Sequence, residues 1–140
     1  MKKIVILFLS IMTIGLSVTS CSKDDNTPKT PSLKGTWEYS KSGVSIGGEE
    51  FLDNWEHAVG CSKDHMEFLN DGKLKDVSYD GANQCAENVT DGTYVKVDDK
   101  LTLNFGGEEI VTTIMTLSAT ELKVSFEDQG LTGIVLFVRK

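Results

Sequence analysis

The chain has 140 residues, of which 39% are hydrophobic and 25% are charged, and its formal net charge is −7 at pH 7. No cluster of Lys and Arg is present that could neutralise a row of phosphates, which argues against nucleic acid as a partner. Thirteen glycines and only two prolines, together with frequent Thr and Val, favour short strands and turns over a helical bundle.

The first twenty residues have the layout of a secretory signal peptide. Lys2 and Lys3 form a basic start, and an apolar run follows over residues 4–18. This run is too short and too close to the N terminus to be a spanning helix. Removing residues 1–20 takes away two lysines and changes the net charge from −7 to −9. About 110 residues then remain, which is enough for one domain with a modest core.

Residues Val18-Thr19-Ser20-Cys21 resemble the lipobox of bacterial lipoproteins, in which an apolar residue and two small residues precede a cysteine. The resemblance implies that Cys21 receives fatty acids such as palmitate and becomes the new N terminus. Several acyl chains would anchor the protein stably in a membrane, because each buried methylene contributes ~0.8 kcal/mol. The alternative is a soluble secreted protein that is cut near Ser20.

Residues 21–32 are polar and contain both prolines of the chain, which predicts a flexible, extended tether. Ser22, rather than Asp, after the cysteine suggests sorting to the outer membrane. Residues 23–25, with the sequence Lys-Asp-Asp, resemble the surface-export signal of some Gram-negative lipoproteins. A merely solvated tether would have the same composition, so periplasmic and cell-surface exposure both stay open.

Period-two alternation predicts eight strands after the tether. They are Gly35–Lys41, Asp64–Leu69, Lys73–Tyr79, Gly92–Val97, Lys100–Phe105, Glu109–Leu117, Glu121–Glu127 and Leu131–Arg139. Most connections are short and rich in Gly, Asp and Asn, so strands adjacent in sequence should pair. We therefore expect an all-β fold, an antiparallel up-and-down barrel over residues 33–140. A barrel of eight strands is just wide enough to fill itself with side chains or to hold one small ligand.

The Gly35-x-Trp37 sequence on the first strand resembles the lipocalin signature, and the strand count agrees with that family. The resemblance covers about residues 33–140 and is closest to the lipocalin-like lipoproteins of bacteria. It implies that Trp37 plugs the closed end of the barrel. It also implies that an arginine covers the tryptophan through a cation–π contact, and Arg139 is our candidate. The other short motifs of the larger lipocalins are not evident.

The alternation also predicts which side chains face the barrel interior and could contact a small hydrophobic or amphipathic ligand. The candidates are Met66, Phe68, Val95, Leu103, Val124, Phe126 and Leu136. The last strand is apolar on both faces. We expect its outward side chains, Val135 and Phe137, to be covered by another segment, because contiguous exposed apolar surface is rare on monomers.

One short helix is expected in the first long loop, over Glu49–Val59. Phe51, Leu52 and Trp55 fall on one face at helical spacing, and Gly60 suits the C-terminal end. The helix could pack on the outside of the barrel, or it could act as a lid over the barrel mouth. In the second case Trp55 would contact the ligand.

Cys61 and Cys85 remain as a pair once Cys21 is lipidated. In an oxidising compartment two such cysteines usually form a disulfide. By the chain-entropy model, closing this loop would stabilise the folded state by roughly 3 kcal/mol. The competing hypothesis is a zinc site that combines both cysteines with His57 and His65. Our prediction is the disulfide and no metal.

Two further motifs match by letter. Residues 43–47 fit the G-x-S-x-G nucleophile elbow, but the chain is too short for the large α/β sheet that this chemistry needs. Residues 76–87 approach the EF-hand calcium loop, but Ser78 replaces a ligand and both flanks are predicted strands. A solvated acidic loop explains the same residues.

These patterns predict a non-catalytic lipoprotein of the outer membrane that binds a small ligand and needs no cofactor. The alternative is a solid barrel that serves as a surface module for protein–protein interaction. The lid-like segment with Trp55 and the doubly apolar last strand motivate that alternative.

Overall fold

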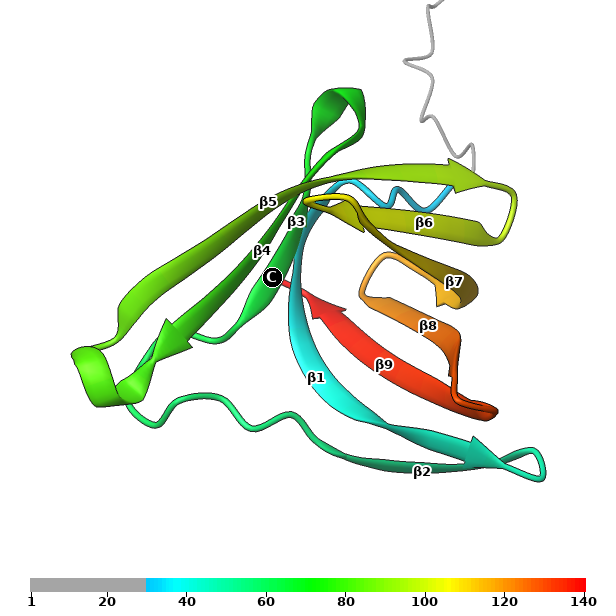
Figure 1. The fold of residues 1–140 in the computed structure, drawn as a ribbon, viewed down its shortest axis with the longest axis horizontal. Helices are drawn as coiled ribbons and strands as arrows, with labels where there is room; N and C mark the ends of the chain where they lie inside the picture. The colour runs from blue at the N-terminus through cyan, green and yellow to red at the C-terminus, as the bar shows by residue number, and fades with distance from the viewer. Residues whose placement is uncertain (1–29) are drawn as a thin grey trace, which may run out of the picture.

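The computed structural model describes residues 30–140 of the chain. The predicted signal peptide, Cys21 and tether residues 21–29 lie outside the described residues. From Gly35 to Arg139 the chain forms nine strands, most of them joined by short turns, with a longer irregular connection over residues 55–64 (Figure 1). Their bounds are β1 Gly35–Ile46, β2 Glu49–Asn54, β3 His65–Phe68, β4 Lys73–Asp80, β5 Ala86–Val97, β6 Lys100–Phe105, β7 Glu108–Leu117, β8 Glu121–Asp128 and β9 Leu131–Arg139.

All neighbouring strands pair antiparallel, in the order β2-β1-β3-β4-β5-β6-β7-β8-β9, and β1 also pairs with β9. Eight strands therefore close into a barrel, and β2 is an extra strand outside that count. β2 and β3 lie along the same edge of β1, because β3 pairs with residues 35–38 and β2 pairs with residues 41–46. The prediction of an eight-stranded antiparallel up-and-down barrel is confirmed.

The predicted helix over Glu49–Val59 is wrong, because its first half is strand β2 and its second half is irregular. Gly47 and Gly48 both have positive φ, 61° and 87°, and form a tight turn that sends the chain back along β1. Among residues 30–140 the helical structure consists of two short 3₁₀ turns, η1 Asn70–Gly72 and η2 Gly81–Asn83. No helix in this part of the chain is long and apolar enough to cross a membrane.

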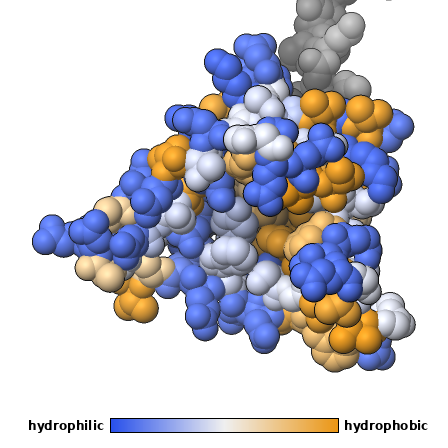
Figure 2. Space-filling model, viewed as in Figure 1, coloured by the Kyte–Doolittle hydropathy of each residue, from blue (hydrophilic) through white to orange (hydrophobic). Residues whose placement is uncertain are grey.

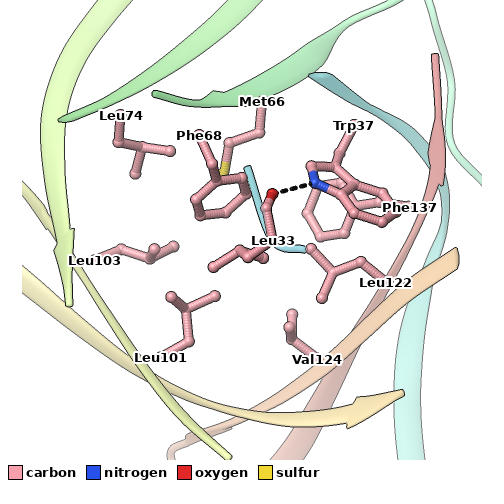
Figure 3. Packing of buried hydrophobic residues seen from close by; sticks show 10 residues of the cluster. All are labelled: Leu33, Trp37, Met66, Phe68, Leu74, Leu101, Leu103, Leu122, Val124 and Phe137. Carbon is pink, nitrogen blue, oxygen red and sulfur yellow. Dashed lines mark hydrogen bonds between the residues drawn. The ribbon is translucent and has the colours of Figure 1, made fainter. Parts of the chain in front are cut away.

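The main hydrophobic core fills one end of the barrel, which we call the closed end (Figure 3). Leu33 lies in the middle of this cluster, with core side chains from the surrounding strands on all sides. The buried members are Leu33, Trp37, Met66, Phe68, Leu74, Leu101, Leu103, Leu122, Val124 and Phe137. Alternate residues of successive strands supply this cluster, as the pleat of an antiparallel sheet requires.

The other end of the barrel, which we call the open end, is less completely paired. The β4–β5 and β1–β2 hairpins extend away from each other at the lower left and lower right of Figure 1. The ladder between β7 and β8 stops at the pair Thr113 and Ser125. Residues 108–112 therefore pair only with β6, and residues 126–128 pair only with β9. Strands β7 and β8 therefore separate on the side of the packed core that faces the open end.

Candidate functional site

The closed end is sealed around Trp37. Its indole is fully buried and donates a hydrogen bond from Nε1 to the Leu33 carbonyl over 2.7 Å. The Arg139 guanidinium lies 4.0 Å from the centroid of the indole ring, which is cation–π geometry. Arg139 also donates to the carbonyls of Ser32, Lys34 and Ala119. One side chain thus ties the start of the domain, the β7–β8 turn and the last strand together.

The arginine places a requirement on Gly35. Gly35 has a φ of 128°, a backbone conformation that residues with a side chain rarely adopt. In addition, a Cβ atom at this position would collide with the Arg139 guanidinium. The glycine of the Gly-x-Trp sequence therefore leaves room for the arginine above the tryptophan. Ser32, which the sequence analysis assigned to the tether, is thus bonded to the barrel through Arg139.

A cavity of about 180 Å³ lies between this core and the open end. Side chains from six strands line it: Tyr39, Met66, Leu103, Ile110, Thr112, Val124, Phe126, Val135 and Phe137. The Thr112 hydroxyl is occupied, because it donates to the Leu101 carbonyl over 2.9 Å. The tyrosine hydroxyl is then the remaining polar group of the lining. The cavity can accept an apolar molecule or the apolar part of an amphipathic one.

Gly133 shapes one side of this cavity. It pairs with Phe126 on β8, and the phenyl ring lies where a side chain at position 133 would project, with a ring carbon 2.7 Å from the Cβ position. The glycine therefore leaves room for the Phe126 ring against β9, beside the cavity that this ring lines.

Beside the cavity, the segment between β2 and β3 forms a network around Tyr39. The Trp55 ring stacks on the Tyr39 ring at a centroid distance of 4.3 Å. Trp55 Nε1 donates to Asp64 Oδ2 over 3.1 Å. The Asp64 N–H donates to His57 Nδ1, so His57 Nε2 carries the proton and donates to the Tyr39 carbonyl over 2.9 Å. These contacts hold the segment against β1 without a helix.

The Tyr39 hydroxyl donates to Asp76 Oδ1 over 3.0 Å. Burial, reinforced by the charge of Asp76, raises the pKa of Tyr39, so the phenol keeps its proton at all physiological pH values. Burial also raises the pKa of Asp76, and the hydrogen bond from Tyr39 opposes this rise. A partly desolvated carboxyl group, that of Asp76, therefore lies next to the one tyrosine of the cavity lining.

A disulfide joins Cys61 to Cys85. It fastens the segment that follows β2 to the tip of the β4–β5 hairpin at the open end, so the predicted pairing is confirmed. Both sulfurs are thereby used, which rules out the zinc site with His57 and His65. Among residues 30–140, no group of three or more His, Cys, Asp or Glu side chains is arranged to hold a metal ion.

Comparison with known families agrees with this architecture. Residues 33–124 match the lipocalin-like domain family. The chain belongs to this family. The match covers the Gly-x-Trp strand and most of the cavity wall, and it ends on β8 at Val124. The lipocalin-like fold is typically a non-catalytic binding fold.

Two solved structures share the lipocalin-like fold at low sequence identity. One is an uncharacterized protein from Bacteroides eggerthii, with a TM-score of 0.59 and 9% identity over 78% of this chain and 100% of that chain. The other is a lipocalin-like protein from Bacteroides uniformis, with a TM-score of 0.58 and 10% identity over 77% of this chain and 98% of that chain. Identities this low support the fold alone. No match was found among the curated proteins.

Four of the predicted interior residues line the cavity of the lipocalin-like barrel, namely Met66, Leu103, Val124 and Phe126. Phe68 faces inward but is packed in the core, with Tyr94 against its ring edge at 5.0 Å. Trp55 is not on a lid helix and does not line the cavity, but it stacks on Tyr39, which does.

Val95 is a correction, because its side chain is 61% exposed on the outside of the barrel. Its neighbour Tyr94 occupies the inner face instead, packs on Phe68 and donates from its hydroxyl to the Leu69 carbonyl over 2.9 Å. Gly92 in the same strand faces inward as well, because it pairs with the buried Leu74. The larger aromatic residue, Tyr94, therefore determines which face of β5 points into the barrel.

Leu136 is the second correction. It pairs with Lys41 and Lys123 on the outer face, while Val135 and Phe137 face the cavity. The expectation that Val135 and Phe137 point outward beneath a covering segment is therefore wrong as well. Alternation cannot show which face of a strand points inward when the strand is apolar at every position. Here the pairing of Phe137 with Tyr39 determines which residues of β9 face the interior.

Sequence reasoning missed five lining residues: Tyr39, Ile110, Thr112, Val135 and Phe137. A signal for Tyr39 was present, since it lies two residues after Trp37 and therefore on the same strand face. The EF-hand-like residues 76–87 form the β4–β5 hairpin, and Asp76 is directed to Tyr39 instead of into a calcium loop. Ser45 of the elbow-like motif lies within strand β1.

Proposed function

We propose that this protein is a lipid-anchored, non-catalytic binding protein of the outer membrane that holds one small apolar or amphipathic molecule in its barrel. The cavity lined by Tyr39, Ile110, Phe126 and Val135 is the observation that carries the proposal. A solid barrel would have no such space, and the last strand that motivated the solid-barrel alternative is packed inside the monomer, with Phe137 buried.

The volume limits the size of the ligand. Pockets for drug-sized molecules hold about 300–1,000 Å³, whereas an apolar cavity of about 150 Å³ binds benzene. At 180 Å³ the site is suited to one aromatic ring or a short alkyl chain, with any further atoms directed to the open end. A long fatty acid would exceed this space.

The proposed anchor would orient the barrel. Residues 30–33 enter at the closed end, where Ser32 is held by Arg139. A chain of about ten residues between Cys21 and this point spans at most about 35 Å. The closed end would then lie nearer the membrane, and the cavity would open on the side that faces away from it.

Binding can be tested on residues 30–140 with 2-phenylethanol as the probe, followed by ligand-observed NMR. The variant Val135→Phe should abolish binding, because it fills the cavity. The matched control Val95→Phe makes the same change on the outer face and should leave binding intact. Equal binding by both variants, or no binding by the wild type, would refute the proposal.

The anchor is tested separately with the full chain in a Gram-negative host. Labelling with radioactive palmitate and fractionation of the membranes should place the lipidated protein in the outer membrane. Cys21→Ser should lose the label and become soluble. Protease treatment of intact cells would then distinguish surface exposure from periplasmic exposure. A wild-type chain without label would contradict the lipid anchor and support a secreted protein.

A further inference from the structure

The inner surface of the barrel is divided into an apolar wall and a polar wall. Strands β6 to β9 contribute the apolar wall, with Ile110, Phe126 and Val135 among its residues. The polar wall comes from the register of β3 to β5. Met66 faces the cavity, its partner on β4 is Asp76, and the partner of Asp76 on β5 is Thr90, so all three share the inner face. Figure 2 shows mostly hydrophilic residues, with a few hydrophobic ones, over the β4–β5 hairpin at left and hydrophobic residues within the central hollow.

Tyr39 lies where the two walls meet. Its ring lines the cavity and packs on Phe137 at a centroid distance of 4.7 Å, while its hydroxyl donates to Asp76 Oδ1. A ligand whose apolar part fills the cavity would therefore place the atoms at its other end close to this hydroxyl and carboxylate.

Two acidic groups near Tyr39, Asp64 and Asp76, differ in their partners. Asp64 accepts a bond on each oxygen, from Trp55 Nε1 and from the Tyr79 N–H. Asp76 accepts on Oδ1 from Tyr39, and no second donor within residues 30–140 bonds to it. Neither acid forms an ion pair with a lysine or arginine of the described chain. The free oxygen of Asp76 can still accept a hydrogen bond, and no lysine or arginine of the described residues neutralises its charge.

We propose that the barrel selects small aryl or alkyl amines, with the apolar part in the cavity and the ammonium group at Asp76 beside the Tyr39 hydroxyl. An ammonium group supplies only donors, which matches a carboxylate that has an unused acceptor. A carboxylate ligand would instead meet the like charge of Asp76. This inference rests on the proposed binding function and specifies its ligand class.

The test compares three probes of equal apolar part on residues 30–140 at neutral pH: 2-phenylethylamine, 2-phenylethanol and phenylacetate. We expect the amine to bind about tenfold more tightly than the alcohol, because a charged hydrogen bond is added, and phenylacetate to bind most weakly. This comparison uses the wild-type protein and needs no variant to fold.

The variant Asp76→Asn should lower the amine affinity to about that of the alcohol, and it should change the alcohol affinity far less, because only the amine loses a charged partner. Asp91→Asn is the matched control, because it removes the same charge on the outer face of the sheet. Asp91 is exposed on β5 and pairs with Lys75, the residue of β4 that precedes Asp76. Its amine affinity should equal that of the wild type.

The outcomes separate the two proposals. If the alcohol and phenylacetate bind as tightly as the amine, the amine selectivity is wrong while the binding function stands. The same holds if Asp91→Asn weakens the amine as much as Asp76→Asn does, since only the overall charge would then matter. If none of the three probes binds, both proposals are refuted.

Discussion

Two aromatic residues on the same face of β1, Trp37 and Tyr39, have opposite surroundings. Trp37 is enclosed by the core, bonded to the Leu33 carbonyl and covered by Arg139. Tyr39 is one step nearer the open end, where its ring borders a cavity and its hydroxyl reaches Asp76. The closed end is thus built for stability, and the open end keeps space and polar groups that a packed core would not need. Four predictions test this difference.

Trp37→Ala should have the largest effect, because it removes the largest fully buried side chain of the closed end. We expect a loss of about 3–5 kcal/mol in the free energy of unfolding, measured by guanidinium denaturation. Tyr39→Phe, which keeps the ring at the open end, should cost far less. Similar losses for both variants would mean that the two ends do not differ in their contribution to stability.

Removing the disulfide should have the next largest effect. The double variant Cys61→Ala/Cys85→Ala opens a loop with a sequence separation of 24 and should lose roughly 3 kcal/mol by the chain-entropy model. Urea denaturation of the wild type in the presence of a reductant should match the double variant. A reduced wild type as stable as the oxidised one would show that the bond contributes little to holding the open end.

Arg139→Ala should destabilise by about 1–3 kcal/mol, because it removes the cation–π contact and the hydrogen bonds to three carbonyls. Arg139→Lys keeps the charge but not the planar fork, so it should recover only part of the loss. Thermal unfolding measures both variants. Full recovery by lysine would show that charge alone, rather than the stacked guanidinium, covers Trp37.

Asp76→Asn should change the free energy of unfolding least of the four, and the change should depend on pH. Burial raises the pKa of Asp76 in the folded protein, so the folded state holds this proton at pH values where the unfolded chain has released it. The wild type should therefore lose stability relative to Asp76→Asn as the pH rises from about 4 through the raised pKa. Tyr39, Asp64 and His65 are the titratable groups that act on Asp76. Melting curves in parallel buffers measure the difference, and a constant difference would contradict the shift.

The comparison also explains which residues could be placed from the sequence. Strands with one apolar and one polar face were located correctly, as with Leu101 and Leu103 on β6, which are both buried. Val95 and Leu136 were placed on the wrong face, because their strands offer apolar residues on both faces. The glycine pair at 47–48 signalled a turn, yet the apolar spacing after it fits a helix and a hairpin strand equally well.

By itself, the amino-acid sequence determined the order of the eight barrel strands, the closed barrel, the Gly-x-Trp start and the cysteine pair, because each depends on local alternation, short turns or a simple count. Tertiary structure decided the rest. The phase of β5 and β9 depends on which aromatic side chains fill the interior, and the cavity depends on the early end of the β7–β8 ladder. The hydrogen bond between Tyr39 and Asp76 joins residues that are 37 positions apart in the sequence. Long-range pairing of this kind is set by register across the sheet, which no local pattern encodes.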